Sequence, residues 1–337
     1  MKKRIVGIHA SYNASEQTLC AEFLAGYIAK CYRFVKWFVP EIPERARGFS
    51  HQWDTEVVPC YGSGEKAKRT AAQCDTFFFF RPQDDLFDAL PRHAVTAFVV
   101  DPRNRTPETV AFGRRCTFTL LPSEQWLDRK NADHRRHILV WPCDPSVQCI
   151  PRIDLDYEKE PRLFFPAFGL SYLDRHFILQ VADIVKRCKP NVKTVVGYYD
   201  ANVIPTAGND SRTHDWRLIR YLQNSDWVID LNPKPLYGLF AACAGGYGLQ
   251  WVGFDTVPNN DEWNASRRHL ISQPIGRPGN QERVLPDLES TATQIVALLD
   301  TPFPSVDQRH RSCGVWDHRR AEYLRVTNIV LGVKTKY

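Results

Sequence analysis

The sequence contains very little methionine and lacks the common motifs that hold metal ions. Met1 is the only methionine among 337 residues, which excludes a methionine-rich surface that adapts to many partners. Ten cysteines are present, but no Cys-x-x-Cys pair occurs and no Cys/His spacing fits a zinc site. Because no signal peptide is recognisable, we expect buried thiols in a reducing compartment, and therefore a cytoplasmic protein.

Long hydrophobic runs and a strong net charge are also missing. The one candidate for a membrane span, Leu236–Phe254, has 19 residues without a charge, but it contains five glycines and no dense run of Leu, Ile or Val. We therefore expect no transmembrane segment. The net charge is only +6, and +4 of it comes from the 21 basic and 17 acidic residues before residue 150. This balance permits a polyanionic partner without requiring one.

The sequence does contain an alternation of short apolar runs with helical patterns, and the alternation occurs twice. Runs such as Asp75–Phe80 and Val95–Val100 are apolar on both faces, which predicts parallel strands covered by helices on each side. The pattern restarts after a Pro/Asp-rich stretch at residues 142–161. We therefore predict an α/β protein with two Rossmann-like parallel-sheet domains facing each other across a cleft, residues 1–150 and 151–312.

The remaining elements follow from the same patterns. A proline inside the predicted strand 163–168 indicates an edge strand or a bulge, because proline cannot donate to a sheet ladder. Further strands are predicted at residues 4–9, 34–39, 116–121, 138–141, 192–197, 227–231 and 249–254, and helices at residues 16–31, 66–73, 172–188, 214–222, 238–244, 288–299 and 316–331.

Several segments of the chain follow one another in a known order and spacing, most clearly Tyr221–Asp230, Leu236–Ala242 and the strand Trp251–Asp255. This series resembles GT-B glycosyltransferases of the glycogen-synthase-like retaining group. Arg175–Ala182 resembles the first helix of the family's donor domain, which a basic residue opens. Val315–Leu324 resembles the tryptophan-bearing C-terminal helix of the same family.

The resemblance implies an enzyme that moves a sugar from a nucleotide-sugar donor to an acceptor hydroxyl, with retention at the anomeric carbon. It implies that residues 151–312 bind the donor, that residues 1–150 lie on the acceptor side, and that residues 313–337 cross back to the first domain. No metal or other cofactor is expected. Pro235 and Cys243 stand where the family has two glutamates, and Leu170 stands where it has an arginine, so the chain resembles a divergent member of the family.

Gly238 begins a predicted helix and is the main candidate for the donor site. Backbone N–H groups at a helix start attract anions, and a glycine lets a phosphate approach closely. The alternative is an ordinary turn glycine. For Arg175 and Lys234, the alternative interpretation is a solvated surface charge. For Asn259 and Glu262, it is a plain polar turn. The candidates for donor binding are Arg175, Lys234, Tyr237, Gly238, Leu239, Asn259 and Glu262.

The acceptor side offers polar residues after two predicted strands. Ser11, Tyr12 and Asn13 follow the first strand and are candidates for contacts to sugar or base hydroxyls, with a ligand-free polar turn as the alternative. Asp101 follows the strand ending at Val100 and is the candidate for an acceptor base or orienting group. Its alternative is a turn aspartate before Pro102.

Three functions remain open from the sequence. The first is sugar transfer to a hydroxymethylated base in DNA, as in phage enzymes of this fold, which suits the basic first half and its pairs such as Arg114–Arg115. A solvated face is the alternative reading of those pairs. The second is sugar transfer in surface-polysaccharide synthesis. The third is a non-catalytic sugar- or nucleotide-binding module, which the missing glutamates favour.

Overall fold

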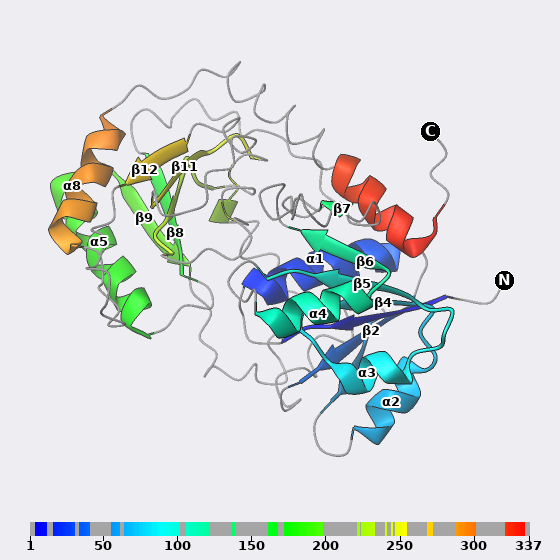
Figure 1. The fold of residues 1–337 in the computed structure, drawn as a ribbon. Helices are drawn as coiled ribbons and strands as arrows, with labels where there is room; N and C mark the ends of the chain where they lie inside the picture. The colour runs from blue at the N-terminus through cyan, green and yellow to red at the C-terminus, as the bar shows by residue number, and fades with distance from the viewer. Residues whose placement is uncertain are drawn as a thin grey trace, which may run out of the picture. The chain divides into compact units, whose positions relative to one another are not determined.

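The computed structural model describes most predicted elements and groups them into two units (Figure 1). Unit 1 holds the described residues of 1–147 and 319–337, and unit 2 those of 148–200 and 214–318. The described residues are 4–11, 16–30, 34–40, 55–60, 64–101, 106–121, 137–138, 161–167, 172–197, 221–222, 224–232, 240, 244, 247–254, 268–271, 287–300 and 321–333.

Unit 1 is built on a seven-stranded sheet whose order is β3-β2-β1-β4-β5-β6-β7, and every neighbouring pair is parallel. This order matches that of a dinucleotide-binding Rossmann sheet. The elements are β1 Ile5–His9, α1 Glu16–Lys30, β2 Phe34–Val39, β3 Thr55–Pro59, α2 Glu65–Ala71, β4 Thr76–Phe79, α3 Asp84–Ala89, β5 Val95–Val99, α4 Pro107–Arg115, β6 Phe118–Leu121 and β7 His137–Ile138.

Phenylalanine rings fill the layer between this sheet and the helices α2, α3 and α4. Phe77 and Phe79 point to the same face of β4, with ring centroids 4.4 Å apart, and Phe112 of α4 packs edge-on at 5.1 Å from Phe79. The Phe77 ring lies over Gly7 of β1, where a Cβ atom would come within 2.3 Å of it. The small residue in β1 thus makes room for the large one in β4.

The last described helix, residues 321–331, belongs to unit 1. Its Asn328 side chain accepts a hydrogen bond from the Tyr27 hydroxyl of α1 at 3.0 Å, and the carbonyl of Leu331 accepts one from Arg4 at 3.5 Å. The end of the chain is therefore held against the first helix and the start of the first strand.

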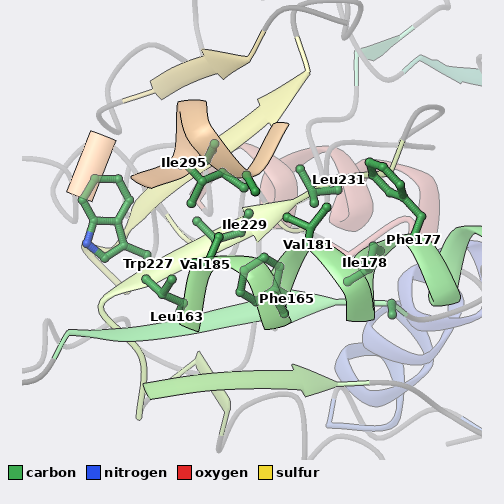
Figure 2. Packing of buried hydrophobic residues seen from close by; sticks show 14 of the residues in the cluster. Leu163, Phe165, Phe177, Ile178, Val181, Val185, Trp227, Ile229, Leu231 and Ile295 are labelled. Atoms are coloured by element: carbon green, nitrogen blue, oxygen red, sulfur yellow. The ribbon is translucent and has the colours of Figure 1, made fainter. Parts of the chain in front are cut away.

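Unit 2 has a five-stranded parallel sheet in the order β12-β11-β10-β8-β9. Apolar side chains of β8 and β10 pack against α5 and α8 to form its core (Figure 2). The elements are β8 Arg162–Pro166, α5 Tyr172–Cys188, β9 Lys193–Gly197, β10 Trp227–Asp230, β11 Gln250–Phe254, β12 Arg268–Ile271 and α8 Leu288–Leu299.

The prediction that the proline-bearing strand is an edge or bulged strand is wrong, because β8 lies between β9 and β10 and pairs with β9 in an unbroken register from Arg162 to Pro166. Its pairing with β10 covers only Leu163 and Phe164, so Pro166 at the strand end is not required to donate on that side. The sequence patterns also missed β3, β12, α3 and α4, while the limits of α5 and α8 are confirmed. The predicted helices at 214–222 and 238–244 lie largely outside the described residues.

An aspartate stands directly before one of the central strands of each unit. In unit 1, Asp75 Oδ2 accepts a hydrogen bond from the N–H of Ile5 at 3.0 Å, and the Asp75 N–H donates to the Ile5 carbonyl at 2.9 Å. In unit 2, Asp226 makes the same two bonds with Arg162, both at 2.9 Å. Each aspartate therefore fixes the amino-terminal end of the pairing between two central strands, β1 with β4 and β8 with β10.

We expect Asp75→Ala to lower the free energy of unfolding by about 1–3 kcal/mol, because the Ile5 N–H loses its acceptor. Asp75→Asn keeps a carbonyl oxygen and should cost less. The matched control is Asp85→Ala, which removes an exposed carboxylate from α3. Urea titration followed by circular dichroism measures the difference, and equal stability of the two alanine variants would contradict the role given to Asp75.

Candidate functional site

Each sheet contains one point where the chain reverses the direction in which it adds strands. In unit 1 this point lies between β1 and β4, and in unit 2 it lies between β8 and β10. Ligands of open parallel sheets bind outside the carboxyl ends of the strands at such a point. The residues that follow these four strands are therefore the candidate site residues of each unit.

In unit 1, side chains after β1 and β4 are joined by hydrogen bonds. His9, the last residue of β1, bonds through Nδ1 to the carbonyl of Arg81 at 3.3 Å. The Arg81 guanidinium donates to the hydroxyl of Ser11 at 2.9 Å. Gln17 of α1 donates to the carbonyl of Phe80 at 3.1 Å. The short segment after β4 is thus attached to both β1 and α1.

His9 is neutral in this setting. Burial lowers its pKa to about 4, and the nearby Arg81 charge acts in the same direction, while the bond to the Arg81 carbonyl only partly opposes them. A carbonyl oxygen can only accept, so Nδ1 carries the proton and Nε2 is left as an acceptor. Among the described residues, no donor reaches the buried Nε2 atom.

The acceptor-side candidates fall partly within this region. Ser11 is buried and bonded to Arg81, and Asp101 is half-buried two residues after β5, the strand next to β4. Both therefore belong to the same edge of the sheet. Tyr12 and Asn13 lie outside the described residues. The catalytic role suggested for Asp101 stays a prediction.

In unit 2, Asp230 ends β10 at the corresponding edge and is almost fully buried. Burial raises the pKa of its carboxyl to about 7, while the backbone N–H of Asn232, 3.3 Å from Oδ1, and the Trp251 side chain stabilise the charged form only in part. Within the described part of the chain, its Oδ2 atom has no hydrogen-bond partner. The site therefore holds a carboxyl group that changes charge near neutral pH.

Arg175 is the one donor-site candidate that the structure describes. It is the fourth residue of α5, whose first residue follows β8 at the carboxyl edge of the sheet, and its buried Nε has no partner among the described residues. A cation in the first turn of a long helix suits an anionic ligand. Lys234, Tyr237, Gly238, Leu239, Asn259 and Glu262 lie outside the described residues, as do Pro235, Cys243 and Leu170.

The basic pairs of the first half are partly neutralised by neighbouring acids. Arg115 forms ion pairs with Asp84 and Asp88 of α3, and Lys68 lies 3.6 Å from Asp85. These pairs support the solvated-face reading for both cations. Arg81 differs, since the described residues provide it with no carboxylate partner.

The five described cysteines are free thiols, as expected. Burial raises the pKa of Cys60, Cys74 and Cys116 to about 12, so these thiols stay protonated and are poor nucleophiles. The expectation of burial fails for Cys188, which is exposed at the end of α5.

Four residues of the candidate sites were not identified from the sequence: His9, Gln17, Arg81 and Asp230. Arg81 follows the apolar run Thr76–Phe79, but only the strand order shows that this strand is the neighbour of β1. Asp230 is a single acid at the end of an apolar strand, and this position is the feature of the sequence that could have indicated a functional residue.

Solved structures with the same fold were found across nearly the whole chain. A glycosyltransferase from Rickettsia africae ESF-5 has a TM-score of 0.60 at 10% identity and covers 99% of this chain and 100% of its own. Anabaena Alr3699/HepE, solved with UDP and glucose, has a TM-score of 0.60 at 12% identity, with 98% and 100% coverage. The chain has the GT-B fold.

The GT-B fold is not limited to one activity. A putative UDP-N-acetylglucosamine 2-epimerase from Listeria monocytogenes matches with a TM-score of 0.57 at 10% identity, covering 99% of this chain and 98% of its own. No protein-family model and no curated protein sequence matches the chain. The GT-B fold alone therefore does not define which reaction this chain carries out. Among the described helices, none is long and apolar enough to cross a bilayer.

Asp230 gives a pH-dependent prediction. Its pKa is raised in the folded state, so the folded chain holds the proton more tightly than the unfolded chain between pH 4 and 7. The stability that this proton contributes is present below about pH 4 and is lost as pH rises toward about 7.

We therefore expect Asp230→Asn to match the wild type at pH 4 and to be more stable at pH 8 by about 1–3 kcal/mol, because it buries no charge. Denaturant titration at both pH values measures this difference. Asp183→Asn, an exposed change on α5, is the control. A constant difference between Asp230→Asn and wild type at all pH values would refute the assignment.

Proposed function

We propose that the protein is a glycosyltransferase that moves a sugar from a nucleotide-sugar donor to an acceptor hydroxyl, with retention at the anomeric carbon. The observation that carries this proposal is the pairing of a GT-B fold with polar residues at the switch point of each unit. In the proposal, unit 2 binds the donor and unit 1 binds the acceptor.

The donor assignment is supported by the chemistry of the edge of unit 2. A nucleotide-sugar carries a diphosphate, and the positive end of the α5 dipole and the Arg175 guanidinium both favour negative charge. Gly238 and its neighbours Tyr237 and Leu239, together with Lys234, are proposed to contact the same diphosphate. Asn259 and Glu262 are proposed to bind hydroxyls of the donor sugar.

The proposed reaction needs no metal ion. As the bond between sugar and diphosphate breaks, negative charge develops on the leaving phosphate, and the cations of unit 2 would stabilise it. Asp101 is proposed to orient the acceptor hydroxyl or to take its proton, because it is half-buried at the carboxyl edge of unit 1. A cytoplasmic location is part of the proposal and is consistent with the free thiols.

For the acceptor, we propose a hydroxymethylated base in DNA. A duplex base must leave the stack to reach an enzyme site, and cations beside that site would hold the flanking phosphates. Arg81 is such a cation at the edge of unit 1. The alternatives are a glycan acceptor of surface-polysaccharide synthesis and a binding module without transfer activity.

The donor assignment predicts that Arg175→Gln weakens UDP binding by about tenfold, because one charge-assisted contact to the diphosphate is lost. Lys186→Gln, at the exposed far end of the same helix, is the matched control and should bind like the wild type. Gly238→Asp should abolish binding by charge repulsion. Calorimetric titration with UDP, in buffer containing a chelator, makes the measurement. Unchanged affinity in both site variants would disprove the donor assignment.

The acceptor assignment predicts transfer of radiolabelled sugar from UDP- or GDP-sugars to hydroxymethylated DNA, with none to unmodified DNA of the same sequence. Asp101→Asn should reduce this transfer by at least about a hundredfold, the usual contribution of a general base. Donor hydrolysis without transfer to either DNA would reject the DNA acceptor. Nucleotide binding with neither hydrolysis nor transfer would identify a binding module.

A further inference from the structure

Phe80 and Arg81 follow β4 at the carboxyl ends of the strands, and three hydrogen bonds hold their backbone. The N–H of Phe80 donates to the His9 carbonyl at 2.9 Å, and Gln17 donates to the Phe80 carbonyl at 3.1 Å. One residue further on, His9 Nδ1 donates to the carbonyl of Arg81 at 3.3 Å. Two of these groups, on His9 and Gln17, are buried side chains, so the backbone that carries Arg81 is held in a defined place.

The Arg81 side chain projects from this anchored backbone with most of its donors unused. Arg81 is exposed, and its one described side-chain hydrogen bond runs from Nη1 to Ser11 Oγ at 2.9 Å. A guanidinium has five N–H donors in a planar fork that fits phosphate or carboxylate oxygens. The Arg115 guanidinium, in contrast, donates to Asp84 and Asp88 and lies over the Phe87 ring.

A second, independent observation concerns His9, the residue that holds the Arg81 backbone. The Nε2 atom of His9 is buried, carries no proton and has no donor among the described residues. His9 is more than nine-tenths buried, and the Arg81 charge acts on its ring. Leaving a buried acceptor unsatisfied costs free energy, so a hydroxyl or water bound at this edge would complete its hydrogen bonding.

We propose that Arg81, with Ser11 and His9, forms a phosphate-binding site at the carboxyl edge of unit 1, and that the acceptor therefore carries a phosphate close to the hydroxyl that is glycosylated. This inference rests on the proposed function and narrows its acceptor. Arg81 binds the phosphate oxygens directly, Ser11 orients the guanidinium, and His9 positions the Arg81 backbone. A nucleic-acid backbone and a phosphorylated sugar both provide this chemistry.

The test compares full-length Arg81→Gln with Arg92→Gln by calorimetric titration. Arg92 is an exposed arginine of the same unit just before β5, at the amino-terminal edge of the sheet, and it controls for general loss of charge. The probes are inorganic phosphate, glucose 6-phosphate and a 12-nucleotide DNA strand with hydroxymethylated cytosine. Circular dichroism confirms that each variant is folded.

We expect Arg81→Gln to weaken binding of phosphate-bearing probes by about tenfold and Arg92→Gln to leave it unchanged. Arg81→Lys, which keeps the charge and loses the fork, should lie between them. A loss for the DNA strand larger than for glucose 6-phosphate indicates a nucleic-acid acceptor, and the reverse indicates a phosphorylated sugar. Equal affinities of Arg81→Gln and wild type for every probe, or no phosphate binding by the wild type, would overturn the inference.

UDP binding separates this test from the proposed function. Arg81→Gln should bind UDP like the wild type, because the donor is assigned to unit 2. A wild-type chain that binds phosphate through Arg81 but does not bind UDP would retain this site and reject the donor assignment. If Arg81→Gln loses UDP affinity as well, Arg81 serves the donor and the inference is wrong.

Discussion

The parallel pairing of two central strands in each unit is the constraint on which the candidate sites depend. Asp75 and Asp226 each bind both the N–H and the carbonyl of the first residue of the neighbouring strand. The Asp75 carbonyl also accepts from the N–H of Val95, which begins β5, and the Asp226 carbonyl accepts from the N–H of Gln250, which begins β11. Fixing the pairing at the amino-terminal end also fixes which residues meet at the carboxyl end, because β1, β4, β8 and β10 are each only four or five residues long. His9 with Arg81 in unit 1, and Asp230 in unit 2, hold their places for that reason.

The two edges differ in the charge that they present. In unit 1, burial keeps His9 neutral, so Arg81 is the charged group of its cluster. In unit 2, Asp230 titrates near neutral pH while Arg175 stands in the first turn of α5. A neutral Asp230 leaves the cation dominant, which favours an anionic ligand, and an ionised Asp230 adds a buried negative charge to the same edge. The charge at this end of unit 2 therefore changes near neutral pH, whereas burial keeps His9 of unit 1 neutral there.

Much of the fold could be predicted from apolar patterns. The limits of α5 and α8 were correct because both helices have amphipathic spacing over three turns or more. The strands β3 and β12 were missed because Thr55–Pro59 and Arg268–Ile271 mix polar and apolar residues in short runs. The position of β8 was predicted wrongly because its proline lies beyond the two residues that pair with β10. Sequence patterns do not show where the pairing between two strands ends. In the candidate site, the sequence named Ser11 after a strand and Arg175 at the opening of a helix, and the structure places both at the carboxyl ends of the strands of their units. Arg81 was missed because its strand had no assigned neighbour.

The sequence by itself determined the α/β class, the parallel strands and the resemblance to GT-B glycosyltransferases, since these depend on local periodicity and on the order of segments along the chain. Only the tertiary structure decided which strands are neighbours, and with that which side chains share an edge. It also decided the protonation of His9 and Asp230, because the pKa of a side chain depends on how completely the surrounding chain removes it from water. Neither strand order nor burial is a property of any local stretch of residues.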